Sequence, residues 1–409
     1  MDSVQLEKKV LLTKLTEIDH AIRANYEKEQ LVGVLAGTSG ASLFQFYYSK
    51  YLDIDENSTF AADLLNLGIA RISEGFNHLS YCSGLSGMGW TLDHLAMEGF
   101  LDEDMDSFLT QIDLPIFNEM ISTLKQGNYD FLHGAIGHAY YFLNRYRSTG
   151  SKTLKSNYKK KLSRFLVEFE RISEKDGTNM IKWPVRSGDL NDSKNYDLGL
   201  SHGMASIISF LTRLYQIDDF KRKTAYLLNG AVEYILQCKN EDSGLVSLFP
   251  TSVSAKNNSS RESRLAWCYG DLGIGFALYS ASKILERNML KENSLEILRH
   301  CVGRVGSHNS GVRDASICHG SFGISQIFNR LFKDTGEVTF KNAARYWIND
   351  GLLKGIDKMG YAGYRQWNHQ NQDWYPTISL LEGISGIGLT LIDYLADFDT
   401  TWDECLMIS

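Results

Sequence analysis

Three side chains with metal-binding chemistry occupy corresponding places in two distant segments. Cys318 and His319 come just before Gly320 in "SICHGSFGIS", and Cys268 lies two residues before Gly270 in "WCYGDLG". Two thiolates and one imidazole are a common zinc ligand set, and three protein ligands leave a fourth tetrahedral position open, as in catalytic zinc sites. The same residue types also fit another interpretation, in which both cysteines are small buried residues at tight helix starts.

Both segments belong to a glycine phrase, Gly-x-x-Gly followed by an apolar stretch, which occurs seven times. Six copies keep both glycines, and the fourth has Ser206 at the second place. The leading glycines are Gly37, Gly84, Gly134, Gly203, Gly270, Gly320 and Gly383. They lie 47 to 69 residues apart, which is enough for two helices and their connections. If all copies point to one axis, the two cysteines and the histidine meet at the same level.

The apolar residues after each phrase recur at helical spacing, as Ile324, Ile327, Phe328 and Leu331 do in "GISQIFNRLF". Seven helical hairpins cannot each bury an apolar face alone, so they must stack. We therefore predict an all-α protein, an α/α toroid (barrel) of seven hairpins with about fourteen helices in two layers. The glycines would mark crowded helix N-termini where a Cβ atom would collide. An open solenoid is the alternative arrangement.

Two stretches interrupt the helical pattern, residues 182–199 and 241–263. We expect them to be irregular loop insertions, on the face of the molecule that bears the glycine phrases, within a single domain of residues 1–409. Long loops on a rigid scaffold often form binding surfaces.

The composition excludes several classes of protein. The 409 residues carry a net charge of −7 and no basic run, which argues against nucleic-acid binding. No signal-peptide stretch or membrane-spanning run is present, so we expect a cytoplasmic protein. Six scattered cysteines fit thiols or metal ligands better than a disulfide framework.

The paired segments "WCYGDLG" and "ICHGSFG", on a background of seven glycine phrases, make the chain similar to the LanC-type lanthionine synthetase family. The resemblance covers essentially the whole chain and implies an α/α toroid with a central zinc ion, Zn2+. The implied zinc ligands are Cys268, Cys318 and His319. The implied catalytic positions are Asp130, His202, Arg264 and Tyr269.

The resemblance implies a cyclase that adds cysteine thiols of a dehydrated precursor peptide to dehydroalanine or dehydrobutyrine. Arg264 suits the enolate that this addition creates, because its charge is permanent. His202 can exchange a proton near pH 7, and Asp130 could hold its imidazole in one tautomer. Each residue also has a structural interpretation: helix capping for Asp130, packing for His202 and Tyr269, and a solvated loop charge for Arg264.

The same resemblance implies a precursor with leader and core segments, a separate dehydratase and a peptide exporter as partners. Peripheral attachment to a membrane-bound biosynthetic complex is an alternative to a freely cytoplasmic location. Whether His133 of the third phrase reaches the metal is left open.

Three other functions remain as alternatives. A LanC-like enzyme could add glutathione to dehydroamino acids in proteins. Protein prenyltransferase β subunits also combine an α/α toroid with a zinc-activated thiol, but their ligand set includes a carboxylate. A non-enzymatic scaffold could bind peptides and use zinc structurally, in which case metal loss would unfold it.

Overall fold

The computed structural model describes residues 3–185, 194–242, 244–254, 261–368 and 371–409. The chain divides into two compact units. Unit 1 consists of Met1–His78, Cys82–Leu101 and Val312–Ser409. Unit 2 consists of Leu79–Tyr81 and Asp102–Gly311. The single domain predicted from the sequence stays a prediction.

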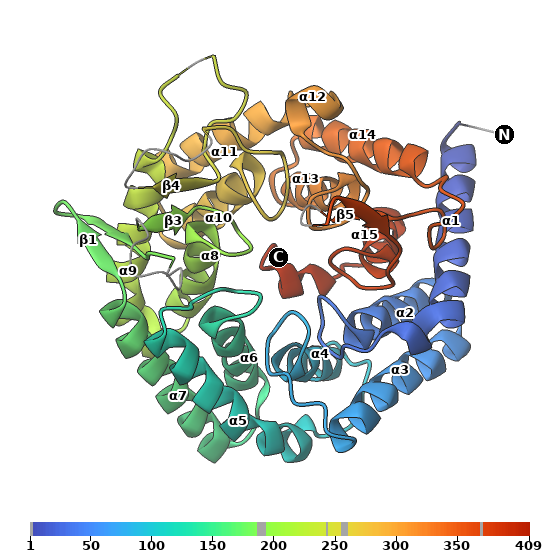
Figure 1. The fold of residues 1–409 in the computed structure, drawn as a ribbon, viewed down its shortest axis with the longest axis horizontal. Coiled ribbons are helices and arrows are strands. Elements are labelled where there is room, and N and C mark those ends of the chain that lie inside the picture. Colours follow the sequence, from blue (N-terminus) through green and yellow to red (C-terminus); the bar gives the residue numbers. More distant parts are fainter. Residues whose placement is uncertain (1–2, 186–193, 243, 255–260, 369–370) are drawn as a thin grey trace. The chain divides into compact units, whose positions relative to one another are not determined.

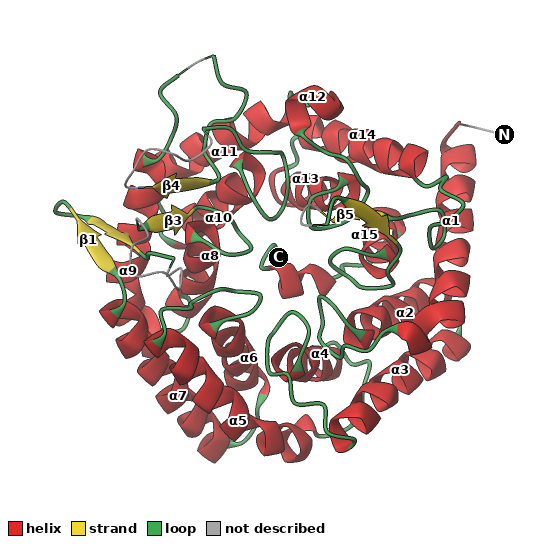
Figure 2. Ribbon diagram, in the orientation of Figure 1, coloured by secondary structure: helices red, strands yellow, loops and turns green. Residues whose placement is uncertain are grey.

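Helices make up most of the described secondary structure (Figure 2), which confirms the all-α class. In unit 1 the α-helices are α1 (Ser3–Asn25), α2 (Thr38–Leu52), α3 (Asp55–Ser73), α4 (Leu85–Met97), α13 (Ser321–Thr335), α14 (Val338–Lys354) and α15 (Ile384–Leu395). In unit 2 they are α5 (Met105–Lys125), α6 (Ala135–Ser148), α7 (Lys152–Arg171), α8 (Met204–Tyr215), α9 (Asp218–Gln237), α10 (Asp271–Ile284), α11 (Asn288–Val302) and α12 (Gly306–Ser310). Two short 3-10 helices in unit 1, η1 (Tyr26–Lys28) and η2 (Trp402–Leu406), complete the set.

Unit 1 joins the two ends of the chain. Helices α2 and α3 pack together, as do α13 and α14 (Figure 1). Helix α15, which follows the seventh glycine phrase, packs against α1, α2 and α13. The seventh pair therefore consists of the last α-helix and the first one, and not of two consecutive helices.

Unit 2 follows the predicted hairpin pattern. Its paired helices are α6 with α7, α8 with α9, and α10 with α11, and α8 also packs against α6 and α10. Helix α7 is an example of the second helix of a pair. Ser151 caps its N-terminus by accepting a hydrogen bond from Leu154 N, and the apolar side chains of α7 form one stripe along the helix. Helix α8, which follows a glycine phrase, is instead buried along nearly its whole length.

The glycines of the phrase allow the preceding loop to pack closely over the start of the helix. A Cβ atom on Gly320 would lie 2.2 Å from Ser316 N, and one on Gly323 would lie 1.8 Å from Ile317 O. Both distances are far below contact distance, so a side chain at either place would displace the loop. The predicted collision of a Cβ atom is confirmed at these two glycines, and the atoms it would meet belong to the loop of the same repeat.

Backbone hydrogen bonds align neighbouring phrases within each unit. In unit 1, Ile317 N and Cys318 N donate to Leu381 O at 3.1 and 2.9 Å, and Leu381 N donates to Leu35 O at 2.9 Å. In unit 2, Leu200 N and Ser201 N donate to Cys268 O at 2.8 and 3.2 Å. Leu35, Cys268 and Leu381 each lie two residues before a leading glycine and accept these bonds, and Cys318, at the same place in its phrase, donates one.

The described strands form three antiparallel pairs of three-residue strands: β1 (Glu174–Asp176) with β2 (Met180–Lys182), β3 (Asn195–Asp197) with β4 (Ser252–Ser254), and β5 (Gln366–Asn368) with β6 (Asp373–Tyr375). Tyr196 is paired with Val253, and Trp367 with Trp374.

The stretches expected to be irregular loops, 182–199 and 241–263, thus contain β3 and β4, which pair with each other, and the last residue of β2. Residues 186–193, 243 and 255–260 of those stretches lie outside the described residues. Asp271, in the first turn of α10, accepts hydrogen bonds from Leu248 N and Phe249 N at 3.0 and 2.9 Å, which fastens the second stretch beside Cys268.

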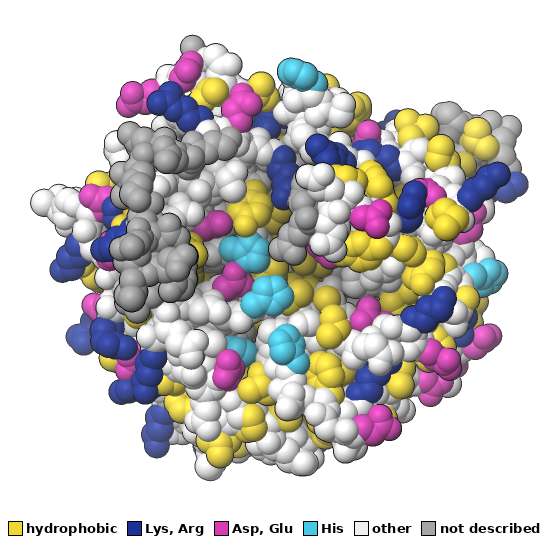
Figure 3. Space-filling view, in the orientation of Figure 1, with side chains coloured by type: hydrophobic (Ala, Val, Ile, Leu, Met, Phe, Trp, Pro, Cys, Tyr) yellow, Lys and Arg dark blue, Asp and Glu magenta, His cyan; other side chains and the backbone are white. Residues whose placement is uncertain are grey.

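The surface carries mixed charge. On the face drawn in Figure 3, Lys and Arg side chains are dispersed among acidic, apolar and uncharged ones. This distribution agrees with the absence of a basic run in the sequence. Among the described helices, none combines the length and the apolar character that crossing a bilayer requires.

Candidate functional site

In unit 2, Asp130 and His202 form a hydrogen-bonded pair. His202 directly precedes the leading glycine of α8, and its Nδ1 contacts Asp130 Oδ2. The other oxygen, Asp130 Oδ1, accepts a hydrogen bond from His133 N at 2.7 Å. Asp130 therefore also shapes the loop before α6, but it does not cap that helix, whose N-cap residue is Gly134.

The pair shifts both pKa values. Burial alone would lower the pKa of His202, but the hydrogen bond to Asp130 and the negative charge of that residue outweigh it and raise the pKa. Burial alone would raise the pKa of Asp130, and the contact with His202 outweighs it and lowers the pKa. Both shifts favour an imidazolium–carboxylate pair over the neutral forms.

Tyr269 and Arg264 extend this cluster. The rings of His202 and Tyr269 have centroids 5.9 Å apart. The guanidinium carbon of Arg264 lies 6.0 Å from the centroid of the Tyr269 ring. His133 also belongs to the cluster, with its ring centroid 6.5 Å from that of His202. Unit 2 thus brings together all four predicted catalytic residues.

A second carboxyl group, that of Asp197, lies beside His202. Burial raises its pKa to about 6, although the Gly199 N–H, His202 and the Tyr269 hydroxyl all act to lower that pKa. Asp197 Oδ1 accepts a hydrogen bond from Gly199 N at 2.7 Å, which shapes the loop before α8. A carboxyl group with this pKa changes its charge close to neutral pH.

Cys268, the predicted ligand in unit 2, is buried immediately before Tyr269. Its carbonyl oxygen accepts the two hydrogen bonds that fix the loop before α8. Cys268, as a thiolate, would help to raise the pKa of His202, after the larger effects of Asp130 and Asp197. Cys268, the predicted ligand, and His202, the predicted proton-transfer residue, are therefore neighbours within unit 2.

In unit 1, Cys318 and His319 lie in the loop before α13. A ring nitrogen of His319 is within 4.8 Å of Cys318 Sγ, so one ion could reach both. His319 Nε2 lies 3.0 Å from Asp314 Oδ2. Burial alone would raise the pKa of Asp314, but its contacts with His319 and with the N–H groups of Trp367 and Ser316 hold that pKa at about 2.

Glu382 is a further buried carboxyl group in unit 1. It directly precedes the leading glycine of the seventh phrase, as His202 and His319 do in theirs. Tyr375 Oη donates a hydrogen bond to Glu382 Oε2 at 3.0 Å. Burial raises the pKa of Glu382, opposed by the charge of His319 and by the Tyr375 hydroxyl.

The predicted site residues are distributed over the two units. Unit 2 holds Asp130, His202, Arg264, Cys268 and Tyr269, and unit 1 holds Cys318 and His319. The assembly of all three ligands on one zinc ion stays a prediction. Sequence reasoning missed Asp197 and Asp314, although each lies six residues before a leading glycine.

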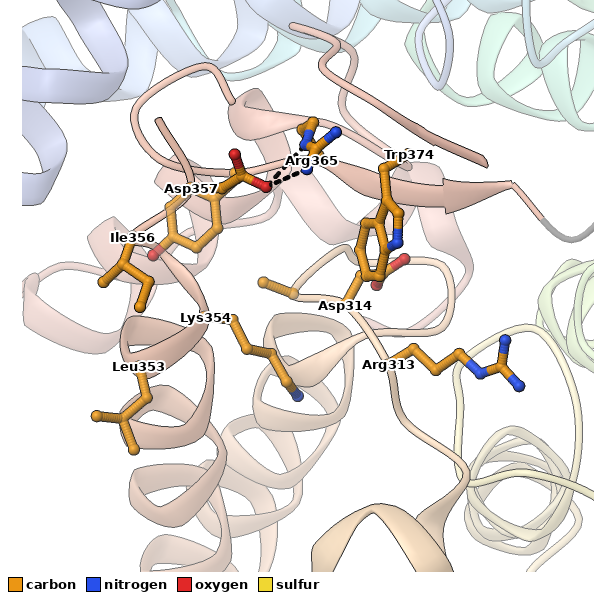
Figure 4. A pocket seen from close by; sticks show the side chains of 10 residues that line it. Arg313, Asp314, Leu353, Lys354, Ile356, Asp357, Arg365 and Trp374 are labelled. Atoms are coloured by element: carbon orange, nitrogen blue, oxygen red, sulfur yellow. Dashed lines mark hydrogen bonds and ion pairs between the residues drawn. The ribbon is translucent and has the colours of Figure 1, made fainter. Parts of the chain in front are cut away.

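A cavity of about 340 Å³ lies in unit 1 beside Asp314 (Figure 4). Two of its basic side chains already have acidic partners: Arg365 lies 2.5 Å from Asp357, and Lys354 lies 2.5 Å from Asp350. A third basic residue of the lining, Arg313, has its guanidinium carbon 5.1 Å from the centroid of the Trp367 ring.

Comparison with known proteins gives the fold and the family. A family model described as Lanthionine synthetase C-like protein matches residues 32–407. The solved structure of the nisin cyclase is similar, with a TM-score of 0.71, 17% sequence identity, and coverage of 99% of this chain and 98% of that chain. A sugar epimerase from ruminal bacterium has a TM-score of 0.41 and 12% identity, with 88% of this chain and 87% of that chain covered.

The fold of the nisin cyclase is a helical toroid, so this match confirms the predicted α/α-toroid class. The family match extends over most of the chain and includes both cysteine-containing phrases. From these two findings we conclude that the chain belongs to the lanthionine synthetase C-like family.

Proposed function

We propose that this protein is a zinc-dependent lanthipeptide cyclase. It adds cysteine thiols of a dehydrated precursor peptide to dehydroalanine or dehydrobutyrine residues and so closes thioether rings. The observation that carries the proposal is the family match over residues 32–407, which contains every residue predicted for the site. A separate dehydratase that prepares the peptide, and an exporter that removes the product, are part of this proposal.

The donor set fits zinc. Cys268, Cys318 and His319 offer two sulfurs and one nitrogen, and Cys268 and Cys318 occupy the same place relative to the leading glycine, where the backbone of each takes part in the same alignment. In this proposal these three residues hold the ion, and the fourth position is left to a substrate. The chemistry that bound zinc supplies is deprotonation of the substrate thiol, which is mostly protonated on its own at neutral pH.

The residues of unit 2 would serve the rest of the addition. The sulfur attacks the β-carbon of the dehydroamino acid, the carbon–carbon double bond is lost, and its electron pair passes through the α-carbon to the carbonyl oxygen. Arg264 is suited to stabilise the resulting enolate oxygen. His202, charged through its contact with Asp130, is suited to deliver a proton to the α-carbon. One proton leaves the thiol and one reaches carbon, so the mass of the peptide is unchanged.

The test is incubation of the zinc-loaded protein with a dehydrated, cysteine-containing peptide, followed by thiol alkylation and mass spectrometry. Cyclisation leaves the mass unchanged and removes alkylatable thiols. Complete alkylation across a panel of dehydrated precursors would contradict the proposal. If glutathione is present and its mass appears on the peptide, the intermolecular alternative is correct instead.

Two variants separate the proposed roles. His202→Ala should keep its zinc and lose roughly 10²- to 10⁴-fold in rate, because it removes only the proton donor. Cys318→Ala should lose zinc, because it removes a ligand. Metal analysis of the purified variants, together with the alkylation assay, checks both expectations. The opposite pattern of metal content would refute the assignment of these two residues.

A further inference from the structure

Asp314 is a buried carboxylate with two separate sets of partners. Its Oδ1 accepts hydrogen bonds from Ser316 N and Ser316 Oγ at 3.0 and 2.9 Å. Its Oδ2 accepts one from Trp367 N at 3.0 Å and lies 3.0 Å from His319 Nε2. The Asp314 side chain has no exposed surface, so these groups must compensate its charge.

The first set of partners is a turn that other phrases also make. Six residues before their leading glycines, Asn128, Asp197 and Thr377 each accept a hydrogen bond from a backbone N–H two residues further on. Those three bonds measure 3.2, 2.7 and 3.1 Å. An amide or a hydroxyl oxygen is therefore sufficient for the turn. The turn explains one oxygen of Asp314 and leaves the second oxygen unexplained.

That second oxygen faces the imidazole of His319. With Nε2 at 3.0 Å from Asp314 Oδ2, Nδ1 is the other nitrogen of the ring and the one that could bind a metal. Metal-ligating histidines usually donate their other N–H to a carboxylate, carbonyl or water, which fixes the tautomer and increases the basicity of the ligand nitrogen. The strand β5, through Trp367 N, holds the same oxygen from its other side. Asp314 and Trp374 of β6, the strand paired with β5, both line the cavity drawn in Figure 4.

We propose that Asp314 is a positioning residue for His319: it accepts a hydrogen bond from the Nε2–H group, fixes the ring orientation, and directs Nδ1 to the metal. This inference rests on the proposed function, because it concerns the same zinc ion. It adds a residue that the sequence did not single out, and it assigns the coordinating atom of His319.

The first test is a zinc competition titration of the full chain. Asp314→Asn retains one oxygen for the turn, as Asn128 does, but places an amide donor where the second oxygen was. We expect zinc affinity to fall about 10- to 100-fold. Asp350→Asn is the matched control, because it removes the same charge from the neighbouring helix α14, where Asp350 contacts Ser321 and Lys354. Its zinc affinity should stay within about twofold of the wild type. Equal affinities for Asp314→Asn and the control would overturn the inference.

The second test needs no variant, so it remains decisive if Asp314→Asn fails to fold. The wild-type protein is labelled with 15N-histidine and loaded with 113Cd in place of zinc. Scalar coupling between the metal and Nδ1 of a histidine that carries its proton on Nε2 is the expected result. Coupling to Nε2 would overturn the inference.

The two levels of the argument can fail separately. If the peptide is cyclised but the metal couples to Nε2, the role of Asp314 is wrong and the proposed function stands. If the metal couples to Nδ1 and Asp314→Asn binds zinc weakly, but no precursor is cyclised, the role of Asp314 stands and the proposed function fails.

Discussion

At the scale of single residues, the environment of His202 is dominated by carboxyl groups. Asp130 contacts its Nδ1, and Asp197, with a pKa of about 6, lies nearby. Burial opposes the charged imidazole, so its raised pKa depends on these neighbours. The proton that the proposed addition requires is therefore held by an interaction between residues from two different loops.

Asp130→Asn should lower the pKa of His202. The substitution removes the negative charge and the hydrogen bond to the imidazolium, so burial then determines the direction of the shift. NMR titration of the His202 ring measures this pKa directly. Because the folded-state pKa of His202 is raised, its contribution to stability is lost as pH rises through that pKa. Because the folded-state pKa of Asp130 is lowered, its contribution is lost as pH falls through its own folded-state pKa, so the pair stabilises the fold only between the two. An unchanged or higher pKa in the variant would show that Asp130 does not control this group.

The sequence identified residues that stand close to a leading glycine better than residues further away. His202, Tyr269 and His319 directly precede their glycines, and the helix start determines where they lie. Asp197 and Asp314 lie six residues before theirs, and acidic residues at such places are common in ordinary turns. Their contacts with His202 and His319 depend on how the loop folds back, and composition does not encode that.

At the scale of elements, a buried ion cluster attaches the C-terminal segment to helices α13 and α15. Arg330 of α13 lies 2.5 Å from Asp403 of η2 and 3.4 Å from Asp393 of α15. Both carboxylate side chains are fully buried, and these two charges raise the pKa of Arg330 against the effect of burial. Such a cluster is stable only while all its members are present.

Arg330→Met should therefore destabilise unit 1 by about 3–5 kcal/mol, because it leaves the buried Asp403 without its cationic partner, whereas Asp393 keeps Lys333 at 3.0 Å. Arg345→Met is the comparison, since Arg345 forms a more exposed ion pair with Glu7, and its loss should destabilise the protein much less than Arg330→Met. Urea unfolding followed by circular dichroism measures both variants. Similar losses of stability in the two variants would show that the buried ion cluster does not stabilise unit 1 more than an exposed ion pair does.

The elements themselves were largely predictable, with two exceptions. The helices after the glycine phrases, such as α8 and α13, follow from the repeat. Strands β3 and β4 did not, because three-residue strands have too little periodicity to distinguish them from a loop. The described parts of the two insertions thus have more order than their composition indicates.

At the scale of the whole molecule, the repeat is completed by a helix that carries no glycine phrase. The sequence predicted seven hairpins of consecutive helices, and the structure instead pairs α15 with α1. Because α1 precedes the first phrase, no repeat signal marks it as the partner of the last helix. Unit 1 consequently contains both ends of the chain, and most of unit 2 is a continuous segment between them.

Leu15→Ala tests the pairing of the two ends. Leu15 of α1 is completely buried, so we expect a loss of about 2–5 kcal/mol in the stability of unit 1. Leu6→Ala is the control on the same helix, because Leu6 is 55% exposed and should change stability by no more than about 0.5 kcal/mol. Hydrogen exchange should become faster in α15 and remain unchanged in α8 and α9. Faster exchange in unit 2 but not in α15 would contradict the pairing.

The pairing of the first helix with the last one also bears on how the protein is made. A ribosome that adds about 5–20 residues per second needs roughly 20 to 70 seconds between completing α1 and beginning α15. Throughout that interval the apolar side of α1 lacks its permanent partner and is open to nascent-chain chaperones. A chain truncated before α15 would keep the apolar side of α1 exposed. We therefore expect truncated chains to be bound by chaperones and degraded through this exposed surface.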